Sequence, residues 1–504
     1  MASKFATVTY CPLSSKDPKD RFAVYNPATG QEITTIQGAG LSEVEAAVAI
    51  AQDAFDNDWR HRSPRERAFL LNKAADHLTA HMGELCQLLS LENGKPVSQA
   101  AEIDVPALVH IFRYFASLID KLPLDFHDEG AIYANIVREP YGVVAGIIPF
   151  NWPPIHVGGK SAPALAAGNT VIIKPGDQAP LTAMRIIEIL QEVLPKGVIQ
   201  AIPSVGLDVP QALVTHPQVK KISFTGSTKA GAAVSKLAAD GIKPLSLELG
   251  GKNALIVFDD ADLDLAVRCA LDGAFFNQGE ACTASSRLLI QSGIHDAFVN
   301  KMAAAVPRLK VGDGARPETH VGPLVSKVHQ QRVLEYIQIG LDEGAEMKAQ
   351  AALPDDPALK EGYFVQPTLF TKVTRTMRIA REEIFGPVVT VTPFESYEEA
   401  VSITNESEYG LFCGVFTKDT TRALRLARDV DVGVVLINNY NRGVMGTPFG
   451  GAKHSGYGRE HCMETLHEYS RPKNIRMPSG RGVIGGWSKV HELVVDEPAT
   501  NGIK

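Results

Sequence analysis

The sequence contains little cysteine, and the few cysteines it has are scattered. There are 6 among 504 residues, and none forms a CxxC motif or a Cys/His pair at the spacing of metal ligands. This pattern argues against a disulfide framework and against a zinc site, and it favours a reducing compartment. We therefore expect no bound metal. The six are Cys11, Cys86, Cys269, Cys282, Cys413 and Cys462.

An excess of positive charge and long apolar stretches are also missing. Lys and Arg number 50 against 57 Asp and Glu, which gives a formal net charge of -7. We therefore expect neither nucleic acid nor an anionic membrane as a partner. No uncharged apolar stretch is long enough to span a bilayer, and the N-terminal segment MASKFATVTYCPLSS lacks the apolar core of a signal peptide. These absences predict a cytoplasmic protein.

Material for a hydrophobic core is ample. A chain of 504 residues with 45% hydrophobic residues exceeds the size of a single core, so we expect more than one domain. From Tyr141 onward, short apolar strands alternate with helical patterns. This alternation is typical of a parallel sheet wound on both faces, which binds nucleotides at the carboxyl ends of its strands. The expected strands are 141–148, 171–173, 198–202, 221–224 and 245–247, and the expected helices are 156–167, 180–193, 208–215 and 226–239.

A second alternating region extends from about residue 253 to 458, after a hinge at the turn 248–252. Before both regions, the pattern predicts short strands within 21–36 and helices over 42–56 and 64–91. Residues 341–362 are expected to form a surface loop, and residues 478–504 an extended tail. The strands expected in the second region are 254–258, 287–291, 388–393, 414–416 and 433–437.

Three residues have local settings that suit catalysis. Cys282 follows a glycine and a small residue, so backbone there can pass close to a ligand, although a free cysteine is more often an inert core residue. Glu248 ends an apolar strand before two glycines, where it suits a general base or, equally, a salt bridge or a helix cap. Asn151 could donate to an oxyanion, but a turn asparagine is the stronger local interpretation.

Seven motifs occur in the order and at the spacings found in the aldehyde dehydrogenase superfamily, which the chain resembles over roughly residues 20–480. They are PFNWP, KPGDQAP, FTGSTKAG, LELGGK, FFNQGEAC, EEIFGPV and PFGGAKHSGYGRE. The resemblance implies an α/β fold with two doubly wound parallel-sheet domains plus a small β oligomerisation flap. It divides the chain into a dinucleotide-binding domain (1–121 and 141–251), a catalytic domain (252–465), oligomerisation strands (122–140 and 466–480) and a C-terminal tail (481–504).

The resemblance also implies catalytic roles. Cys282 corresponds to the nucleophile that forms a thiohemiacetal and then a thioester. The Asn151 side chain and the Cys282 N–H correspond to the oxyanion hole. Glu248 corresponds to the base that activates the hydrolytic water. Glu460 resembles a supporting proton-relay carboxylate, and Lys160 occupies the family's lysine position near the nucleophile.

The cofactor positions match as well, and they imply NAD with NADP as the second candidate. Lys174 resembles the lysine that contacts the adenosine ribose. Asp177 stands where many NAD-preferring relatives carry glutamate, and its charge would oppose a 2′-phosphate. Phe385 resembles a nicotinamide contact, with plain core packing as the alternative. The other expected contacts are Ile148, Pro149, Gly226, Ser227, Leu249 and Glu383.

The expected substrate pocket keeps aromatic residues but loses two bulky ones. Gly159 and Gly443 stand where relatives often carry large aromatic residues, and no arginine stands at the positions that bind carboxylate tails. We therefore expect a bulky, largely uncharged aldehyde, aromatic or long-chain, unless Met445 or another loop residue fills the space. Glu280 replaces a common glutamine. The remaining pocket residues are Trp152, Phe276, Thr283 and Phe449.

The oligomerisation strands imply a homodimer or homotetramer, because an isolated hairpin is only marginally stable in water. Two other functions compete with aldehyde oxidation. One is a catalytically silent crystallin-like or binding protein, which the joint presence of Cys282, Glu248 and Asn151 opposes. The other is a CoA-acylating aldehyde dehydrogenase, which usually lacks the water-activating glutamate, so Glu248 favours hydrolysis.

Overall fold

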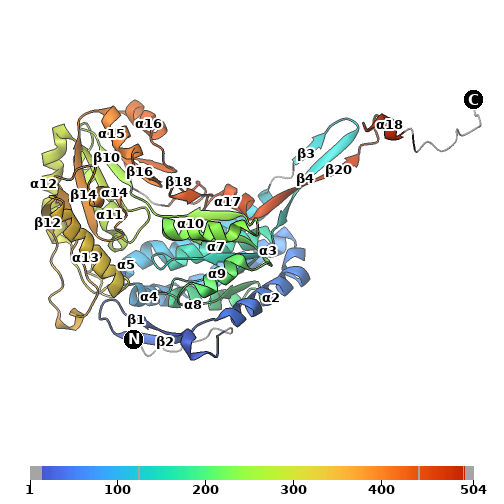
Figure 1. The fold of residues 1–504 in the computed structure, drawn as a ribbon, viewed down its shortest axis with the longest axis horizontal. Coiled ribbons are helices and arrows are strands. Elements are labelled where there is room, and N and C mark those ends of the chain that lie inside the picture. The colour runs from blue at the N-terminus through green and yellow to red at the C-terminus, as the bar shows by residue number, and fades with distance from the viewer. Residues whose placement is uncertain (1–13, 123–124, 441–442, 492, 494–504) are drawn as a thin grey trace, which may run out of the picture.

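The computed structural model of the chain describes residues 14–122, 125–440, 443–491 and 493. Cys11 and the last residues of the predicted tail, 494–504, lie outside the described residues. Two α/β bodies lie against one another, and a slender β flap projects from them (Figure 1). None of the helices in the described ranges is long and apolar enough to cross a membrane. The cytoplasmic location stays a prediction.

The first body starts with an antiparallel strand pair and a group of helices. Local sequence explains where α3 begins, because Ser63 and Glu66 form a capping box there. The Ser63 hydroxyl accepts a hydrogen bond from the Glu66 N–H, and the Glu66 carboxylate accepts one from the Ser63 N–H at 2.8 Å. The elements are β1 (Arg21–Tyr25), β2 (Glu32–Gln37), α2 (Leu41–Asn57), α3 (Pro64–Ala80), α4 (Met82–Asn93), α5 (Val97–Gln99), the π-helical turn η3 (Ala100–Asp104) and α6 (Val105–Leu118).

The first sheet has the order β19-β9-β8-β5-β6-β7, and all its strands are parallel except β19. Its central strands β5 and β6 are buried at every residue, as expected for a parallel sheet that is covered on both faces. The strands are β5 (Val143–Ile147), β6 (Thr170–Lys174), β7 (Ile199–Ala201), β8 (Val219–Thr225), β9 (Leu245–Glu248) and β19 (Gly456–Tyr457). The helices between them are α7 (Pro153–Ala167), α8 (Leu181–Gln191), α9 (Asp208–Thr215) and α10 (Thr228–Ala239).

Successive strand residues enter opposite cores. Val144 packs with α3, α6, α7 and α8 on one face, whereas Val143 and Ala145 pack with α2, α9 and α10 on the other. The alternation follows from the two-residue period of a strand. The first sheet is therefore doubly wound, as the sequence predicted.

The second sheet has the order β12-β13-β14-β11-β10-β16-β17, with only the edge strand β12 antiparallel. Helices again cover both faces. Its strands are β10 (Ala254–Val257), β11 (Arg287–Gln291), β12 (Glu346–Gln350), β13 (Thr368–Thr371), β14 (Val388–Phe394), β16 (Phe412–Phe416) and β17 (Val434–Ile437). The helices of this part are α11 (Leu263–Phe275), α12 (His295–Ala305), α13 (Lys327–Asp342), α14 (Arg378–Arg381), α15 (Tyr397–Asn405) and α16 (Thr420–Asp429).

Three sequence-based expectations need correction. Residues 341–362 are not all loop, because they contain β12, a half-exposed edge strand whose sequence EMKAQ lacks a repeated apolar face. The last flap strand begins at Ser470 rather than at residue 466, since residues up to Glu468 belong to α17 (Met463–Glu468). The tail contains a short helix, α18 (Ser488–His491), and is not extended throughout.

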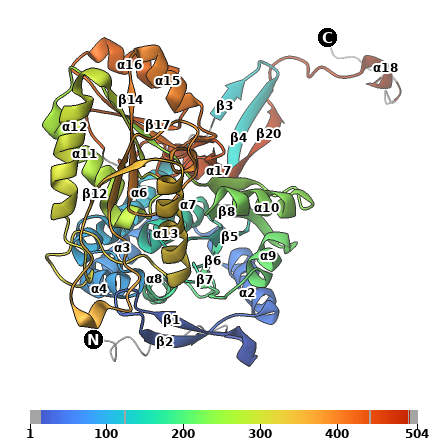
Figure 2. The same ribbon diagram turned by 60° about the vertical axis from the view of Figure 1, so that its left-hand side comes forward.

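The flap is a three-stranded antiparallel sheet in the order β20-β4-β3. It joins β20 (Ser470–Pro478) to β4 (Ile132–Pro140) over nine residue pairs, and β3 (Asp125–Asp128) pairs with the other edge of β4. Figures 1 and 2 show that the flap stands clear of both bodies. Exposed apolar side chains lie on it, among them Phe126, Ile475 and Met477.

Candidate active site

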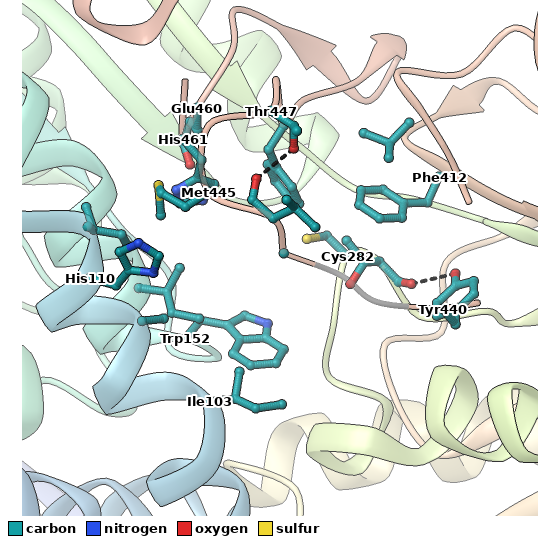
Figure 3. A pocket seen from close by; sticks show the side chains of 18 of the residues that line it. Ile103, His110, Trp152, Cys282, Phe412, Tyr440, Met445, Thr447, Glu460 and His461 are labelled. Carbon is teal, nitrogen blue, oxygen red and sulfur yellow. Dashed lines mark hydrogen bonds between the residues drawn. The ribbon is translucent and has the colours of Figure 1, made fainter. Parts of the chain in front are cut away.

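Segments that are distant in the chain meet in one pocket (Figure 3). Glu248 ends β9, Cys282 follows the short helix η5 (Phe276–Gly279), Trp152 caps α7, and Glu460 follows β19. The pocket has a volume of about 720 Å³. Volumes of this size suit ligands the size of a drug molecule or an aromatic metabolite.

The loop before Cys282 has an unusual backbone. Asn277, Gln278 and Gly279 have φ angles of 53°, 56° and 72°, so three consecutive residues are left-handed. A Cβ at Gly279 would lie 2.3 Å from the carbonyl oxygen of Gly386, so only glycine fits there. Strained backbone of this kind persists only where surrounding contacts hold it, and it concentrates at functional sites.

Further contacts fix the backbone at Cys282. Its carbonyl accepts a hydrogen bond from Asn253 Nδ2 at 2.7 Å, and a Cβ at Gly251 would lie 2.3 Å from the same oxygen. The side chain is partly exposed and lines the pocket. Within the described part of the chain, nothing accepts a hydrogen bond from the Cys282 N–H. This N–H is therefore available to a ligand oxygen.

Cys282 and Glu248 influence each other's protonation. Burial, followed by the nearby Glu248 carboxyl, raises the pKa of the Cys282 thiol well above its usual value. Burial likewise raises the pKa of Glu248 to about 8, and a weak contact with the thiol opposes that rise. Neither Glu248 oxygen has a hydrogen-bond partner of normal geometry among the described residues. The carboxyl is thus free to accept a proton inside the pocket.

Asn151 lies beside the nucleophile loop and does not line the pocket itself. It is 2% exposed, and its Nδ2 donates to the carbonyl oxygen of Glu280 at 3.0 Å. An amide nitrogen carries two hydrogens, so one remains for a second acceptor. The geometry is compatible with the predicted oxyanion role, although that role stays a prediction.

Lys160 and Glu460 form a buried ion pair with 2.9 Å between Nζ and Oε1. Lys160 also donates to the Ser223 hydroxyl at 3.2 Å. Burial alone would raise the pKa of Glu460, but Lys160 and the neighbouring His461 and His156 together outweigh it and hold the pKa at about 2. Glu460 is therefore a fixed negative charge on the pocket wall.

A second buried network lies behind Trp152, and the sequence analysis did not identify it. Lys95 forms an ion pair with Asp104, and both side chains are 0% exposed. Lys95 Nζ also donates to the Asn151 carbonyl at 3.1 Å and lies 4.2 Å from the centre of the Trp152 ring. No local signal marks this pair, because its members are nine positions apart in the chain and Asp104 lies in a π-helical turn.

Glu280 is part of the same buried region. It is 0% exposed, and its Oε1 accepts a hydrogen bond from the Val325 N–H at 3.0 Å. Burial raises the pKa of Glu280 to about 8, although the hydrogen bonds from the Val325 N–H and the Gln278 side chain lower it. Glu280, which replaces a common glutamine, is therefore a glutamic acid that stays protonated at neutral pH.

The predicted adenosine contacts lie at the carboxyl ends of β5 and β6. Lys174 and Asp177 form an ion pair with each other. Ile148 is buried, and its N–H donates to the Lys174 carbonyl at 3.0 Å. Pro149 lies against Gly176, where a Cβ would meet the Pro149 carbonyl carbon at 2.9 Å. These contacts bring the two strand ends together.

The predicted pyrophosphate contacts lie at the start of α10. Ser227 caps this helix, with its hydroxyl accepting from the Ala230 N–H at 3.2 Å. The Gly226 N–H donates to the Glu248 carbonyl at 3.1 Å, so this donor is already used within the sheet. The neighbouring Thr225 hydroxyl is buried, and its oxygen has no partner among the described residues. A polar ligand at this helix start would satisfy it.

Glu383 and Phe385 lie across the turn that joins the two sheets. Glu383 Oε1 accepts from the Gly251 N–H at 2.8 Å, and burial raises its pKa to about 7. Phe385 has a φ of 62° and packs edge-on against Phe150 with 6.0 Å between ring centres. A phenylalanine in this strained conformation is unlike ordinary core packing.

Leu249 differs from these residues. It is 5% exposed, and a Cβ at Gly231 of α10 would lie 2.5 Å from its Cδ2. Leu249 therefore packs tightly against α10, and its predicted contact with a cofactor stays a prediction.

Most predicted substrate residues do line the pocket. Trp152 and Phe276 are stacked, with 5.5 Å between ring centres and 14° between planes. Thr283, Gly443 and Phe449 also line it. The aromatic pair gives the pocket a flat apolar wall that suits an aromatic ligand.

Gly159 is not among the residues that line the pocket. A Cβ there would lie 3.5 Å from His461 and 3.6 Å from Glu460, which is ordinary contact, so a methyl group would fit and only a larger side chain would meet those two residues. Met445 does line the pocket, yet the volume of about 720 Å³ remains beside it. Met445 therefore does not fill the space.

One cluster outside the pocket has ligand types that suit a metal: His77, His81 and Glu192, whose ligand atoms lie within 4.8 Å of one another. His77 Nε2 is 2.6 Å from Glu192 Oε2, and His81 Nδ1 is 3.0 Å from Glu84 Oε2. These ion pairs account for the cluster without an ion. That no metal takes part in the chemistry stays a prediction.

Comparison with known proteins gives consistent results. A model of the aldehyde dehydrogenase family matches residues 13–475. Aldehyde dehydrogenase citD of Monascus ruber is 55% identical over 474 residues, which cover 94% of each chain. An aldehyde dehydrogenase of Didymella fabae is 54% identical and covers 96% of this chain and 98% of its own.

Solved structures agree with the sequence comparison. PnpE in complex with nicotinamide adenine dinucleotide has a TM-score of 0.90 at 40% identity, covering 92% of this chain and 95% of its own. Betaine aldehyde dehydrogenase from Staphylococcus aureus has a TM-score of 0.90 at 36% identity, covering 93% and 94%. Because sequence and fold match over nearly the whole chain, it belongs to the aldehyde dehydrogenase family.

Proposed function

We propose that this chain oxidises a bulky aldehyde to its carboxylic acid through a covalent intermediate on Cys282. The observation that carries the proposal is the shared pocket of the Cys282 thiol and the Glu248 carboxyl, whose oxygens have no hydrogen-bond partner of normal geometry among the described residues. A nucleophile and a base in one cavity are what acyl transfer requires. Membership of the aldehyde dehydrogenase family supports the same reaction.

In the first half of the reaction, the sulfur of Cys282 bonds to the aldehyde carbon, and the carbonyl π electrons move to the oxygen. The thiol releases its proton, and the Glu248 carboxylate is the acceptor within the pocket. The remaining Asn151 amide hydrogen and the Cys282 N–H would stabilise the oxyanion of the thiohemiacetal. Both donors are on fixed backbone or buried side chains, so little reorganisation is needed.

A nicotinamide dinucleotide fits the residues at the carboxyl ends of the first sheet. The buried Thr225 hydroxyl, which has no partner among the described residues, and the N-terminus of α10, which Ser227 caps, offer polar contacts to a pyrophosphate. Lys174 and Asp177 would hold the adenosine ribose, and Glu383 and Phe385 the nicotinamide end. When bound, the oxidised dinucleotide supplies the acceptor for the hydride that leaves the thiohemiacetal carbon. PnpE and the Staphylococcus aureus enzyme were solved with NAD, which supports this assignment.

NAD is the preferred dinucleotide in this proposal. The Asp177 carboxylate is partly exposed beside Lys174, where it would repel the 2′-phosphate of NADP. Its charge is shared with Lys174, so discrimination is expected to be incomplete. Comparing kcat/KM for the two dinucleotides tests the preference.

Before the second half, Glu248 passes the thiol proton on to solvent. Glu248 then takes a proton from water while the water oxygen bonds to the thioester carbon. The Cys282 sulfur then leaves with the electrons of the broken C–S bond, and the acid is released. The fixed negative charge of Glu460 raises the pKa of Glu248, whereas Lys160 lowers it. In this proposal these two residues thus adjust the pKa of the Glu248 carboxyl and do not contact the thioester. A carboxyl poised for hydrolysis favours water over CoA as the acyl acceptor.

The pocket lining supports a bulky and largely uncharged substrate. Trp152, Phe276, Phe412 and Phe449 line it, and the charged side chains at Glu102, Asp272 and Glu460 are acidic. Acidic groups disfavour an aldehyde with a carboxylate tail. Turnover of acetaldehyde relative to benzaldehyde checks the size preference, and a strong preference for acetaldehyde would contradict it.

Formation of NADH at 340 nm with a panel of aldehydes tests the function, for wild type and for Cys282→Ala. We expect oxidation by the wild type and none by the variant. If folded wild-type protein oxidises no aldehyde with either dinucleotide, a silent crystallin-like or binding protein is the better description. Turnover that needs added CoA would instead identify an acylating dehydrogenase.

We also propose that the flap mediates assembly into a homodimer or homotetramer. Its strands expose Phe126, Ile475 and Met477 at 60%, 42% and 44%. Apolar side chains on a projecting sheet with free edges favour pairing with another copy.

A further inference from the structure

Two histidines on the pocket wall have no evident role in aldehyde oxidation. His156 lies in the first turn of α7, and His461 follows Glu460. Both line the pocket that contains Cys282. His156 is 6% exposed, and among the described residues neither of its ring nitrogens has a hydrogen-bond partner. The buried Nδ1 of His461 also lacks one within the described chain.

Both imidazoles are uncharged at neutral pH. Burial, followed by the Lys160 ammonium, lowers the pKa of His156 to about 3. Burial also lowers the pKa of His461, although Glu460 opposes it. A neutral imidazole has one N–H donor and one nitrogen acceptor, and neither tautomer of His156 is fixed by a protein partner. Both nitrogens are enclosed in this structure, so a ligand in the pocket reaches them only when the ring turns, and the ring can then donate or accept.

An unpaired imidazole on an apolar wall is unfavourable, so its partner has to be water or substrate. His461 packs edge-on against Phe449, with 5.5 Å between ring centres. The stacked Trp152 and Phe276 rings provide flat apolar surface in the same pocket. The pocket can thus hold a ligand that has an aromatic ring and a polar group at the edge of that ring.

We propose that His156, assisted by His461, recognises a hydroxyl group on the substrate, which is a hydroxylated aromatic aldehyde. A hydroxyl both donates and accepts, as a neutral imidazole does, and it adds no charge beside the acidic Glu460. The proposal rests on the proposed function, because the same pocket has to oxidise the aldehyde. It adds that the pocket selects for polarity as well as for size.

Matched substrates test the proposal. The three hydroxybenzaldehydes and the three methylbenzaldehydes have nearly equal shapes but differ in hydrogen bonding. We compare the ratio of kcat/KM for hydroxy over methyl in wild type and in His156→Leu. Dividing the two ratios cancels the intrinsic reactivity of each aldehyde. We expect the ratio for at least one positional isomer to fall about tenfold or more in the variant, mainly through KM.

Two further variants control for folding and for the substitution itself. His156→Gln keeps a donor and an acceptor, so its ratio should stay closer to wild type than that of His156→Leu. His61→Leu changes an exposed histidine outside the pocket and should leave the ratio unchanged. Inhibition of the wild type by phenol and by toluene gives a readout without an aldehyde group, and phenol should bind more tightly.

The outcomes separate this inference from the proposed function. If no aldehyde is oxidised, the proposed function fails. If aldehydes are oxidised but His156→Leu keeps the wild-type ratio for all three isomers, and phenol inhibits no better than toluene, His156 binds only water and the inference is wrong.

Discussion

At the scale of single residues, four buried glutamates around the pocket differ in charge because their neighbours differ. Burial raises the pKa of Glu248 and of Glu280 to about 8, and that of Glu383 to about 7. Glu460 is also buried, but Lys160 and the neighbouring His461 and His156 together hold its pKa at about 2. At pH 7, Glu248 and Glu280 are therefore mostly protonated, and Glu460 is ionised.

The protonation of Glu248 predicts how the rate depends on pH. A base with a pKa of about 8 is active only when it has lost its proton, so kcat of the wild type should rise as the pH rises through about 8. Glu248→Gln has no carboxylate at any pH. We expect it to lower kcat about 10²–10⁴-fold at pH 9 and to flatten the profile. A variant profile that still rises through pH 8 would assign the titration to another group.

The raised pKa of Glu280 predicts how the stability of the fold depends on pH. Its pKa is about 8 in the folded chain and near the ordinary 4.5 when unfolded, so the folded state holds the extra proton. Stability is therefore lost as the pH rises from about 4.5 to 8. Glu280→Gln resembles the protonated acid and cannot titrate. We expect it to stabilise the protein by about 1–3 kcal/mol at pH 8 and by little at pH 5.

Thermal unfolding of wild type and Glu280→Gln at both pH values measures this effect. The neighbouring Gln278 amide lies 3.3 Å from Glu280 Oε2 and can rotate to accept from the new amide. A variant with a lower Tm at pH 8 would show that Glu280 is ionised in the folded protein.

At the scale of elements, the π-helical turn η3 determines where the wall behind Trp152 lies. Asp104, at the end of this turn, pairs with Lys95, which also holds the Asn151 carbonyl. Turns of this kind are found frequently at functional sites. The pair thus links η3 to the segment that carries the predicted oxyanion donor.

Removing one member of this pair should be worse than removing both. Lys95→Met leaves Asp104 buried without a counter-charge, which we expect to destabilise the fold by about 3–5 kcal/mol. The double variant Lys95→Met/Asp104→Leu leaves no unpaired charge and should recover most of that loss. Denaturant unfolding of the three proteins checks the order. Equal free energies of unfolding for the single and double variants would mean that an unpaired Asp104 charge does not destabilise the fold.

At the scale of the whole molecule, the two sheets meet at the turn after β9, and the flap extends away from both (Figure 1). The pocket needs residues from both bodies, since Trp152 and Glu248 come from the first part and Cys282 from the second. The flap contributes nothing to the pocket lining among the described residues. Its length and its exposed apolar side chains suit contact with another copy instead.

This arrangement predicts the effect of a charge on the flap. Ile475→Lys places a charge on β20, and we expect it to shift the protein from an oligomer toward smaller species. Sedimentation velocity measures the change. Leu424→Lys, on α16 and 56% exposed, is the matched control and should leave the oligomer intact. A wild type that sediments as a monomer, or a variant that assembles normally, would contradict the proposed role of the flap.

The sequence by itself determined the fold class and the family. Alternating apolar strands and amphipathic helices are local patterns, so the doubly wound sheets followed from residues such as those of β5 and β6. The motif around Cys282 and the strand end at Glu248 were likewise readable, because each motif is continuous in the chain. β12 was missed because an edge strand that is half exposed has no apolar periodicity.

Only the tertiary structure decided the state and the partners of the site residues. Lys95 meets Asp104 of a π-helical turn. His156, whose ring has no partner among the described residues, lies on a wall completed by Glu460 and His461, which come 304 and 305 positions later in the chain. The pKa values of Glu248 and Glu460 differ because burial and nearby charges act through space. Such effects depend on distances that no local pattern contains.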